Sequence, residues 1–259
     1  GSAMNALLTS EIRKVTTLKF WWALAIAPIV VGVFASVITS VIANQLGEFE
    51  EDLDISGGVA SIGLYVAAGA AILFAGIFGA VNAGTEFRHK TITTSFLTAR
   101  GRDGVIAAKL IVTALFGLGY GLVVLLASLI CLLIFNERTV LLDGAFIGVV
   151  ASCLLAVVLW SMIGAGLGLL LKSPTWAAIV LVAWLPFGEG LISLILFGLG
   201  LGSVAVALPS NLTLPTMAAT QLDDAGDLAS WPWAPFGLAL WAAILTGVGW
   251  FLARTRDID

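Results

Sequence analysis

The chain has 259 residues, of which 60% are hydrophobic and only 11% are charged, and its mean hydropathy is +1.08. Soluble domains carry about 25% charged residues, so this composition excludes an ordinary soluble domain and indicates an integral membrane protein. The net charge of −4 argues against a nucleic-acid partner, because proteins that bind nucleic acids carry a basic surface.

Residues 4–19 predict an amphipathic helix, after residues 1–3, which are expected to be an expression scar. Leu8, Ile12 and Val15 recur at the spacing of one helix face. Three charged residues lie off that face: Glu11, Arg13 and Lys14. We expect this helix to lie on the membrane surface and to lead into the first spanning helix.

Six apolar stretches dominate the rest of the chain. A helix needs about 20 mostly apolar residues to cross a bilayer. The stretches that meet this requirement lie at 20–43, at 60–84, at 107–135, at 144–171, from about 176, and at 236–253. We therefore predict that 4–259 form a single all-α transmembrane domain with six spanning helices.

The basic residues predict the orientation of these helices. With six spans, eleven of the twelve lysines and arginines fall on one side of the membrane, and only Arg138 falls on the other. Basic loops face the cytoplasm. We therefore expect both termini to be cytoplasmic, together with the connection at 85–106 between the second and third spans.

The segment 86–110 gathers five of the twelve basic residues. Glu86 and Lys90 are four positions apart, so they would pair if the second helix continued. Three apolar residues would then share one face of a short helix: Ile92, Phe96 and Leu97. The charges alone are explained by topology, whereas the short helix is expected to rest on lipid or on a cytoplasmic partner.

The fifth apolar stretch contains a predicted break. Pro186 removes a backbone donor, and glycines on both sides of Glu189 weaken the helix there. Counted from Trp176, Glu189 lies about 20 Å into the bilayer, where a carboxyl must face protein or water or be protonated. Two interpretations remain: Glu189 and Pro186 belong to a translocation path or gate, or Glu189 is a hydrogen-bonded residue that holds the break.

The segment after the second span resembles that of ABC-2 type permeases, the membrane subunits of ABC exporters with the type V fold. These permeases carry a Gly-x-Glu-x-Arg-x-x-Thr-Ile run, a leucine-rich helix, then Ser/Thr-Arg and Ala-Lys-Leu at the start of the third span. The matching residues are Gly84, Glu86, Arg88, Thr91, Ile92, Leu97, Arg100, Ala108, Lys109 and Leu110. The style of the sequence is similar to that of actinobacterial permeases.

This resemblance implies roles for two cytoplasmic segments. The helix within 85–106 would be the coupling helix, which docks on a separate ATP-binding subunit through Glu86, Phe87, Arg88, His89, Lys90, Thr91 and Arg100. The N-terminal helix would be the connecting helix at the same interface, with Glu11, Arg13 and Lys14. Residues 203–234 would form a re-entrant segment at the outer face.

The chain contains no GxxxxGK[ST] phosphate-binding run. We therefore expect no catalytic residue, metal or cofactor on this chain, with ATP and Mg²⁺ held by the partner. The resemblance implies two ATP-binding subunits and a second permease, either a copy or a homologue, in the lipid of a bacterial inner membrane. The apolar interior favours efflux of an amphiphilic or lipophilic substrate such as a drug, lipid or peptide.

Two other classes of function are open to a chain of this composition. An ATP-independent transporter or a sensor subunit would also be built from spanning helices, although no inverted repeat is evident. An intramembrane enzyme is less favoured, because Glu189 is the only ionisable residue predicted within the bilayer and a catalytic set is missing.

Overall fold

The computed structural model describes residues 2–49, 55–88, 102–135, 144–218 and 229–255. Within these ranges the chain forms helices joined by short turns, and no strand is present. The helices are α1 (Ser2–Thr17), α2 (Phe20–Phe49), α3 (Ile55–Arg88), α5 (Arg102–Phe135), α6 (Gly144–Leu171), α7 (Pro174–Ala183), the π-helix η1 (Trp184–Gly188), α8 (Glu189–Gly198), α9 (Gly202–Val206), α10 (Pro209–Met217) and α11 (Trp233–Thr255).

Among the described residues, six helical segments are long and apolar enough to cross a membrane, which confirms the predicted number of spans. The first four are α2, α3, α5 and α6. The fifth is formed by α7, η1 and α8 together, and the sixth is α11. Such helices form because apolar side chains surround the whole helix and every backbone polar group is bonded within it.

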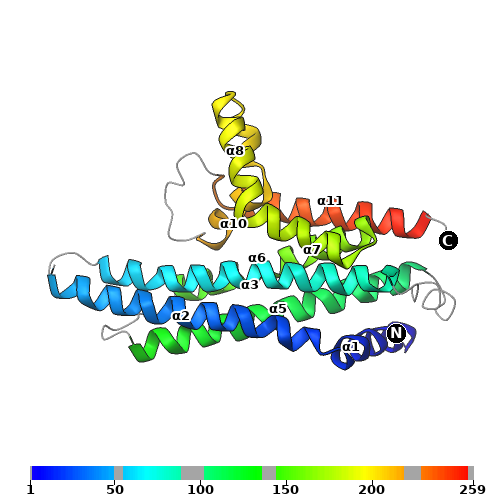
Figure 1. Cartoon of the computed structure of the whole chain (residues 1–259), viewed down its shortest axis with the longest axis horizontal. Helices are drawn as coiled ribbons and strands as arrows, with labels where there is room; N and C mark the ends of the chain where they lie inside the picture. Colours follow the sequence, from blue (N-terminus) through cyan, green and yellow to red (C-terminus); the bar gives the residue numbers. More distant parts are fainter. Residues whose placement is uncertain (1, 50–54, 89–101, 136–143, 219–228, 256–259) are drawn as a thin grey trace.

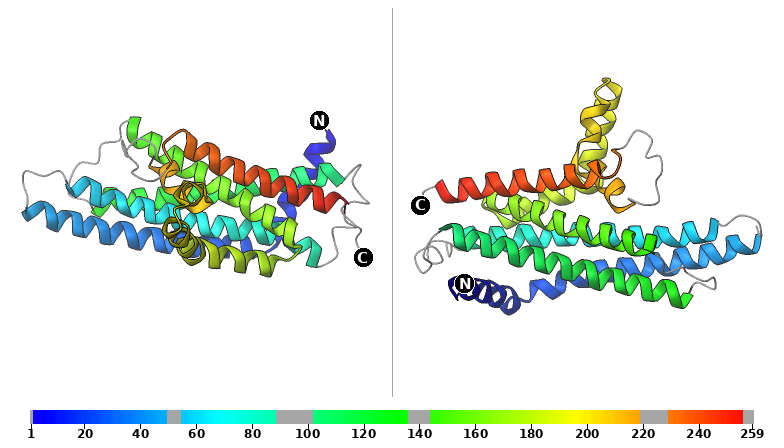
Figure 2. Two further views of the ribbon diagram at one scale, coloured as in Figure 1. Left: turned by 90° about the horizontal axis from the view of Figure 1, so that it is seen from above. Right: turned by 180° about the vertical axis from the view of Figure 1, so that it is seen from behind.

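The four long helices lie side by side, and α7 and α11 cover one face of this group (Figure 1). Helix α3 is central, since it packs against α2, α5, α6 and α7. Both termini lie at the same end of the bundle (Figure 1), called here the terminal end. Helix α1 runs across the direction of the bundle at this end (Figure 2), as expected of a helix on a membrane surface.

Close backbone contact joins α3 to α6. A Cβ atom on Gly164 of α6 would collide with the carbonyl oxygen of Gly76 on α3. Only glycine permits this approach, which is a common device where membrane helices pack. On the other side of α3, the Phe78 ring stacks against Phe20 and Phe116, with ring centroids 5.7 and 5.3 Å apart. Small and aromatic residues of α3 therefore determine the distances to its neighbours.

The turn between α6 and α7 packs on the end of α3. Lys172 has a φ of 52°, the left-handed conformation that ends many helices. The Ser173 hydroxyl accepts a hydrogen bond from the backbone N–H of Trp176, and Pro174 takes the first helical position. Gly84 faces this turn so closely that a Cβ atom there would lie 2.6 Å from the Pro174 nitrogen. The turn therefore packs directly against the end of α3, the helix that leads to residue 89.

The fifth span differs from a straight membrane helix. The break expected at Pro186 takes the form of η1, the five-residue π-helix, which widens the turn where proline cannot donate a hydrogen bond. Beyond it α8 turns away from the other helices and points out of the bundle (Figure 1). The sequence predicted the break, and the structure adds the change of direction.

The segment after α8 returns to the bundle as α9 and α10. The Trp160 indole on α6 donates a hydrogen bond of 2.8 Å to the Thr213 hydroxyl on α10. The Trp241 indole on α11 donates one of 2.7 Å to the Ala207 carbonyl, between α9 and α10. Part of the predicted re-entrant segment is therefore helical and packed on two spans, while residues 219–228 lie outside the described residues.

A candidate functional site at the terminal end

Four charged side chains meet at the terminal end, where α1, α3 and α5 converge. The Lys109 ammonium on α5 lies 2.7 Å from Glu11 on α1 and 3.4 Å from Glu86 near the end of α3. Lys14 of α1 lies 2.7 Å from Glu11 and 2.6 Å from Glu86. We call Glu11, Lys14, Glu86 and Lys109 the charged cluster. Its two carboxylates and two ammonium groups balance, and it joins three helices.

Most of the cluster is shielded from solvent. Glu11 and Lys109 are each 3% exposed, and Glu86 is 7% exposed, whereas the Lys14 side chain is 39% exposed. Breaking a buried ion pair by removing one partner costs about 3–5 kcal/mol, because the remaining charge is left without compensation. The cluster therefore fixes the position of α1 on the bundle more strongly than a surface ion pair would.

The pKa of Glu11 follows from two opposing effects. Burial raises the pKa of this carboxyl, but the ammonium groups of Lys109 and Lys14 outweigh burial, and its pKa falls below the ordinary value of 4.5. Burial lowers the pKa of Lys14, and the hydrogen bonds that it donates to Glu11 and Glu86 outweigh burial, so its pKa rises above 10.5. Both groups are charged throughout the neutral range.

The buried face of α1 is not the face that the apolar spacing predicts. Val15 is buried as expected, but Ile12 is 40% exposed and Glu11 is buried. Glu11 was expected to lie off the packed face, and this part of the prediction is wrong. The reason is that Lys109 presents a buried positive charge, so α1 turns a carboxylate inward instead of a third apolar side chain.

A second polar contact lies where α5 begins. The Asp103 carboxylate accepts a hydrogen bond of 2.8 Å from the Trp250 indole on α11. The same carboxylate lies 3.6 Å from the Arg254 guanidinium. Asp103 therefore connects the first turn of α5 to the end of α11, although this contact is exposed and contributes less than the charged cluster.

These contacts flank residues 89–101, which lie outside the described residues. Glu86 precedes that segment and bonds to α1 and α5, and Asp103 follows it and bonds to α11. A displacement of the segment would therefore act directly on α1, α3, α5 and α11. This arrangement can transmit mechanical force.

The structure brings together some of the predicted site residues. Glu11, Lys14 and Glu86 meet in the charged cluster, where the described partners of Glu86 are Lys14 and Lys109, and Arg13 is exposed on α1. The predicted pairing of Glu86 with Lys90 involves a residue outside the described ranges. The side chains of Phe87 and Arg88 lie outside the described residues, as do the following four predicted residues altogether: His89, Lys90, Thr91 and Arg100. No sequence periodicity indicates the contact of Lys109 with Glu11, since 98 positions separate them.

Glu189 lies in a separate polar site beside the π-helix. Its side chain is 1% exposed. One carboxylate oxygen accepts hydrogen bonds from the Trp184 indole at 2.6 Å and from the Ser210 backbone N–H at 2.8 Å, and the other accepts from the Asn211 backbone N–H at 2.8 Å. The carboxylate thus caps the first turn of α10, whose amide groups would otherwise lack partners.

Asn211 adds a second connection between the same helices. Its amide nitrogen donates hydrogen bonds to the Ser193 hydroxyl at 2.8 Å and to the Ala205 carbonyl at 2.7 Å. Together with Glu189, these bonds hold α8, α9 and α10 as one unit. Pro186 lies in η1 and is exposed. The hydrogen-bonded role of Glu189 is therefore visible, and a role in a translocation path stays a prediction.

Comparison with known families gives one match. The family model described as "ABC-2 family transporter protein" matches residues 7–185. The matched range includes all four residues of the charged cluster and ends within η1, before Glu189. A search of curated proteins found no match.

Proposed function

Because this chain belongs to the ABC-2 transporter family, we propose that it is the permease subunit of an ATP-driven exporter, powered by a separate ATP-binding subunit. The family and the six apolar helices make the chain a multi-pass membrane transport subunit. The direction of transport, the use of ATP as energy source and the type of substrate are proposed here.

The charged cluster carries the proposal. An ATP-driven permease must pass movement from a water-soluble motor to helices in the bilayer, and rigid connections at one end of the bundle are needed for this. Buried ion pairs join α1, α3 and α5 on one side of residues 89–101. Asp103 joins α5 to α11 on the other. We assign this end to the cytoplasm and residues 85–106 to the coupling segment.

The predicted interface residues divide into two groups on this proposal. Glu86 and Glu11 are buried in contacts within the chain, so their role is to transmit movement. The docking contacts then come from Arg13, which is exposed on α1, and from the remaining predicted residues of the coupling segment: Phe87, Arg88, His89, Lys90, Thr91 and Arg100.

The proposed assembly contains two ATP-binding subunits, which hold ATP and Mg²⁺, and a second permease that is a copy or a homologue of this chain. It lies in the inner membrane of a bacterium. Leu191, Leu194 and Ile195 on α8 are 60–72% exposed, and we expect lipid or the second permease to cover them. The apolar character of the spans supports an amphiphilic or lipophilic substrate.

Co-purification tests the proposal. The chain would be expressed with the ATP-binding protein encoded beside its gene and purified through a tag on the permease, and ATP hydrolysis would be measured. We expect a stable complex with ATPase activity. Failure of every such protein to bind would contradict the proposal and favour an ATP-independent transporter.

A pair of matched variants tests the coupling segment. Replacing Arg88 and His89 with alanine is expected to leave the chain in the membrane but to weaken recovery of the ATP-binding subunit. Arg138→Ala removes a charge from the predicted opposite side and serves as the control. Equal recovery from both variants would exclude residues 88 and 89 from the interface.

Glu189 provides a candidate gate. The hydrogen bonds from Ser210 and Asn211 support the idea that α10 is held by this carboxylate in the closed arrangement. The test is transport by Glu189→Gln in the purified complex. Unchanged transport would show that the charge is dispensable and that the role of Glu189 is structural.

A further inference from the structure

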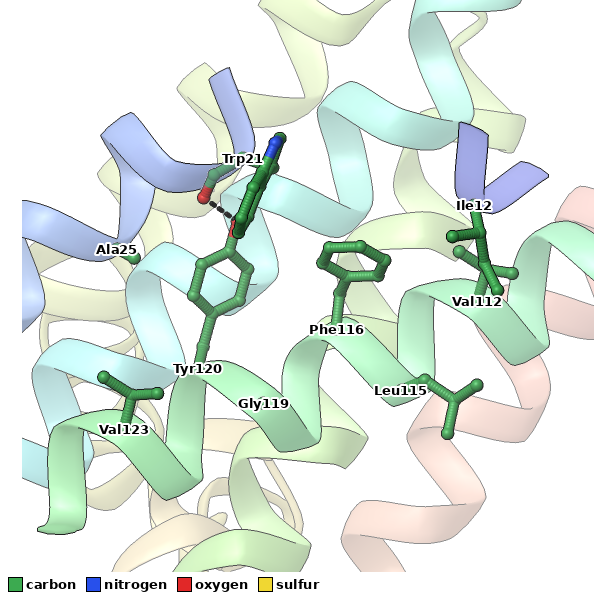
Figure 3. Close-up of a pocket in the computed structure, with 9 residues that line it drawn as sticks. All are labelled: Ile12, Trp21, Ala25, Val112, Leu115, Phe116, Gly119, Tyr120 and Val123. Carbon is green, nitrogen blue, oxygen red and sulfur yellow. Dashed lines mark hydrogen bonds between the residues drawn. The ribbon is translucent and has the colours of Figure 1, made fainter. Parts of the chain in front are cut away.

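An apolar groove runs along the outside of the bundle between α2 and α5 and ends beneath α1 (Figure 3). Its volume is about 340 Å³, which is at the lower end of the range of ligand pockets. Trp21 of α2 and Phe116 and Tyr120 of α5 form its walls, and Ile12 of α1 closes one end. Ile12 is 40% exposed because its side chain faces this open groove.

The shape of the groove fits an extended chain. Val112 and Val123 lie at its two ends and are eleven positions apart on α5, which corresponds to about 16 Å along the helix. Because α5 is a spanning helix, the groove is parallel to the acyl chains of the surrounding lipid. Leu115 and Val123 are 54% and 50% exposed, so the groove opens sideways toward the lipid.

The walls of the groove offer few polar side-chain groups. The Tyr120 hydroxyl, its one side-chain hydroxyl, donates a hydrogen bond to the carbonyl of Trp21 (Figure 3). The other side chains that line the groove are apolar apart from the indole nitrogen of Trp21. An occupant therefore gains mainly from burial of apolar surface, and the Trp21 indole N–H is the one side-chain donor on the described wall that it could meet.

Two exposed basic residues, Arg13 and Lys19, lie on either side of the end of the groove in the sequence, although neither lines it. The charged cluster is balanced within itself, because two lysines face two glutamates. Lys19 lies at the junction of α1 and α2, two positions before the groove wall at Trp21, whereas Arg13 follows Ile12 and lines a hollow on another side of α1 with Thr9 and Thr17. Both are exposed, and neither forms an ion pair with another described side chain. Their long side chains can place their charges at the level of lipid headgroups.

We propose that this groove is a specific site for one anionic phospholipid of the leaflet at the terminal end. One acyl chain lies in the groove against Phe116 and Tyr120. The phosphate headgroup lies at the junction of α1 and α2, near Arg13 and Lys19. The lipid thereby fills the space between α1 and the spans on the side of α1 that faces the groove.

Gly119 allows the groove to be filled without disturbing the fold. A Cβ atom at Gly119 would meet no other atom within 4 Å, and the same holds for Gly247 on α11, which is outside the groove. Gly119→Leu would occupy the acyl-chain site. Gly247→Leu makes the same chemical change in another spanning helix and is the matched control.

Native mass spectrometry of the delipidated chain, titrated with dioleoyl phosphatidylglycerol or dioleoyl phosphatidylcholine, tests the proposal. We expect one phosphatidylglycerol to bind to the unchanged chain and to Gly247→Leu, with at least tenfold weaker binding to Gly119→Leu. The double variant Arg13→Gln and Lys19→Gln is expected to bind both lipids equally.

Two results would overturn the proposal. Equal binding of phosphatidylglycerol to Gly119→Leu and Gly247→Leu would show that no lipid occupies the groove. Equal binding of the two lipids to the unchanged chain would remove the headgroup site. Cross-linking with a photoactivatable acyl chain locates the lipid independently: labelled peptides from α2 and α5 support the site, and labelling spread over all spans contradicts it.

Discussion

At the scale of single residues, Glu11 shows how a polar side chain can fix a surface helix. It is on α1, it is 3% exposed, and its carboxylate bonds to Lys109 of a spanning helix. A charge in this position is stable only with its partners, because desolvation of an unpaired carboxylate is costly. The consequence is that loss of one side chain of the charged cluster leaves the others without compensation.

Glu11→Ala tests this dependence. We expect a loss of about 3 kcal/mol in unfolding free energy, because Lys109 keeps only the more distant Glu86 as a partner. Lys14→Ala should cost less, since Lys14 is partly exposed. The measurement is reversible unfolding in mixed detergent micelles. The double variant Glu11→Ala with Lys109→Ala completes a double-mutant cycle, and losses that simply add would argue against ion pairing between the two residues.

Glu189→Gln tests the second polar site. The glutamine amide keeps one acceptor oxygen but replaces the other oxygen with an NH₂ donor. This NH₂ group then faces either the Asn211 N–H or the Trp184 and Ser210 N–H groups, which are donors too. The expected cost is about 1–3 kcal/mol, as for a buried group left unsatisfied. Ser193→Ala, which removes one of two acceptors of Asn211, serves as the milder comparison in the same unfolding assay. Equal effects would contradict the capping role.

At the scale of helices, α3 combines sites where a methyl group fits with sites where it does not. A Cβ atom at Gly84 would lie 2.6 Å from the Pro174 nitrogen, whereas a Cβ atom at Gly69 would meet nothing within 4 Å. Both glycines are in the same helix, so they share any change in helix propensity. The contact with the α6–α7 turn is therefore the difference between them.

Alanine substitution at these two glycines should have opposite effects. Gly84→Ala should destabilise the chain by about 1–3 kcal/mol, because the backbone at Pro174 must move. Gly69→Ala should stabilise it by up to about 1 kcal/mol, because alanine favours the helix. Thermal unfolding in detergent measures both. Equal melting temperatures would show that the α6–α7 turn yields without cost.

The attachment of α1 should depend on pH in a predictable way. The lowered pKa of Glu11 means that its contribution is present above 4.5 and is lost as pH falls through the folded-state value. The raised pKa of Lys14 means that its contribution is present below 10.5 and is lost only as pH rises above that value. Between these limits the two contributions are constant.

Spin labels at Thr17 and Ile111, both exposed, report this attachment once Cys131 and Cys153 are replaced by alanine. We expect one narrow distance distribution from pH 5 to pH 9 and a broad one only when the pH falls below the folded-state pKa of Glu11, which is lower than 4.5. The Glu11→Gln variant has no carboxyl to titrate at position 11, so its distance distribution should not change as the pH falls below 5. If Glu11→Gln shows the same broadening at acid pH as the chain with Glu11, the broadening is caused by another carboxyl group.

At the scale of the whole molecule, the six spans and the common end of the termini imply a defined orientation. The distribution of basic residues predicts that the terminal end faces the cytoplasm. Single cysteines test this in the cysteine-free background. Arg138→Cys should react with a membrane-impermeant maleimide in intact cells, and Arg100→Cys should react only after permeabilisation. The reverse pattern would invert the topology.

The sequence predicts the parts of this fold that depend on composition along the chain. The spans follow from hydropathy, and the break at η1 follows from Pro186. Contacts between distant segments do not follow from it. Glu11 meets Lys109 across 98 positions, and Glu189 meets Asn211 across 22. The direction of α8 also depends on what packs around it, which no local pattern records.

The long separation between Glu11 and Lys109 has a consequence for biosynthesis. The ribosome completes α1 and α2 well before Lys109 is made, so the α1 carboxylate spends that time without its main partner. Newly made α1 must wait at the membrane surface until the third span has been released and inserted. Nascent chains that end before α5 should therefore present α1 to proteases, and chains that include α5 should protect it.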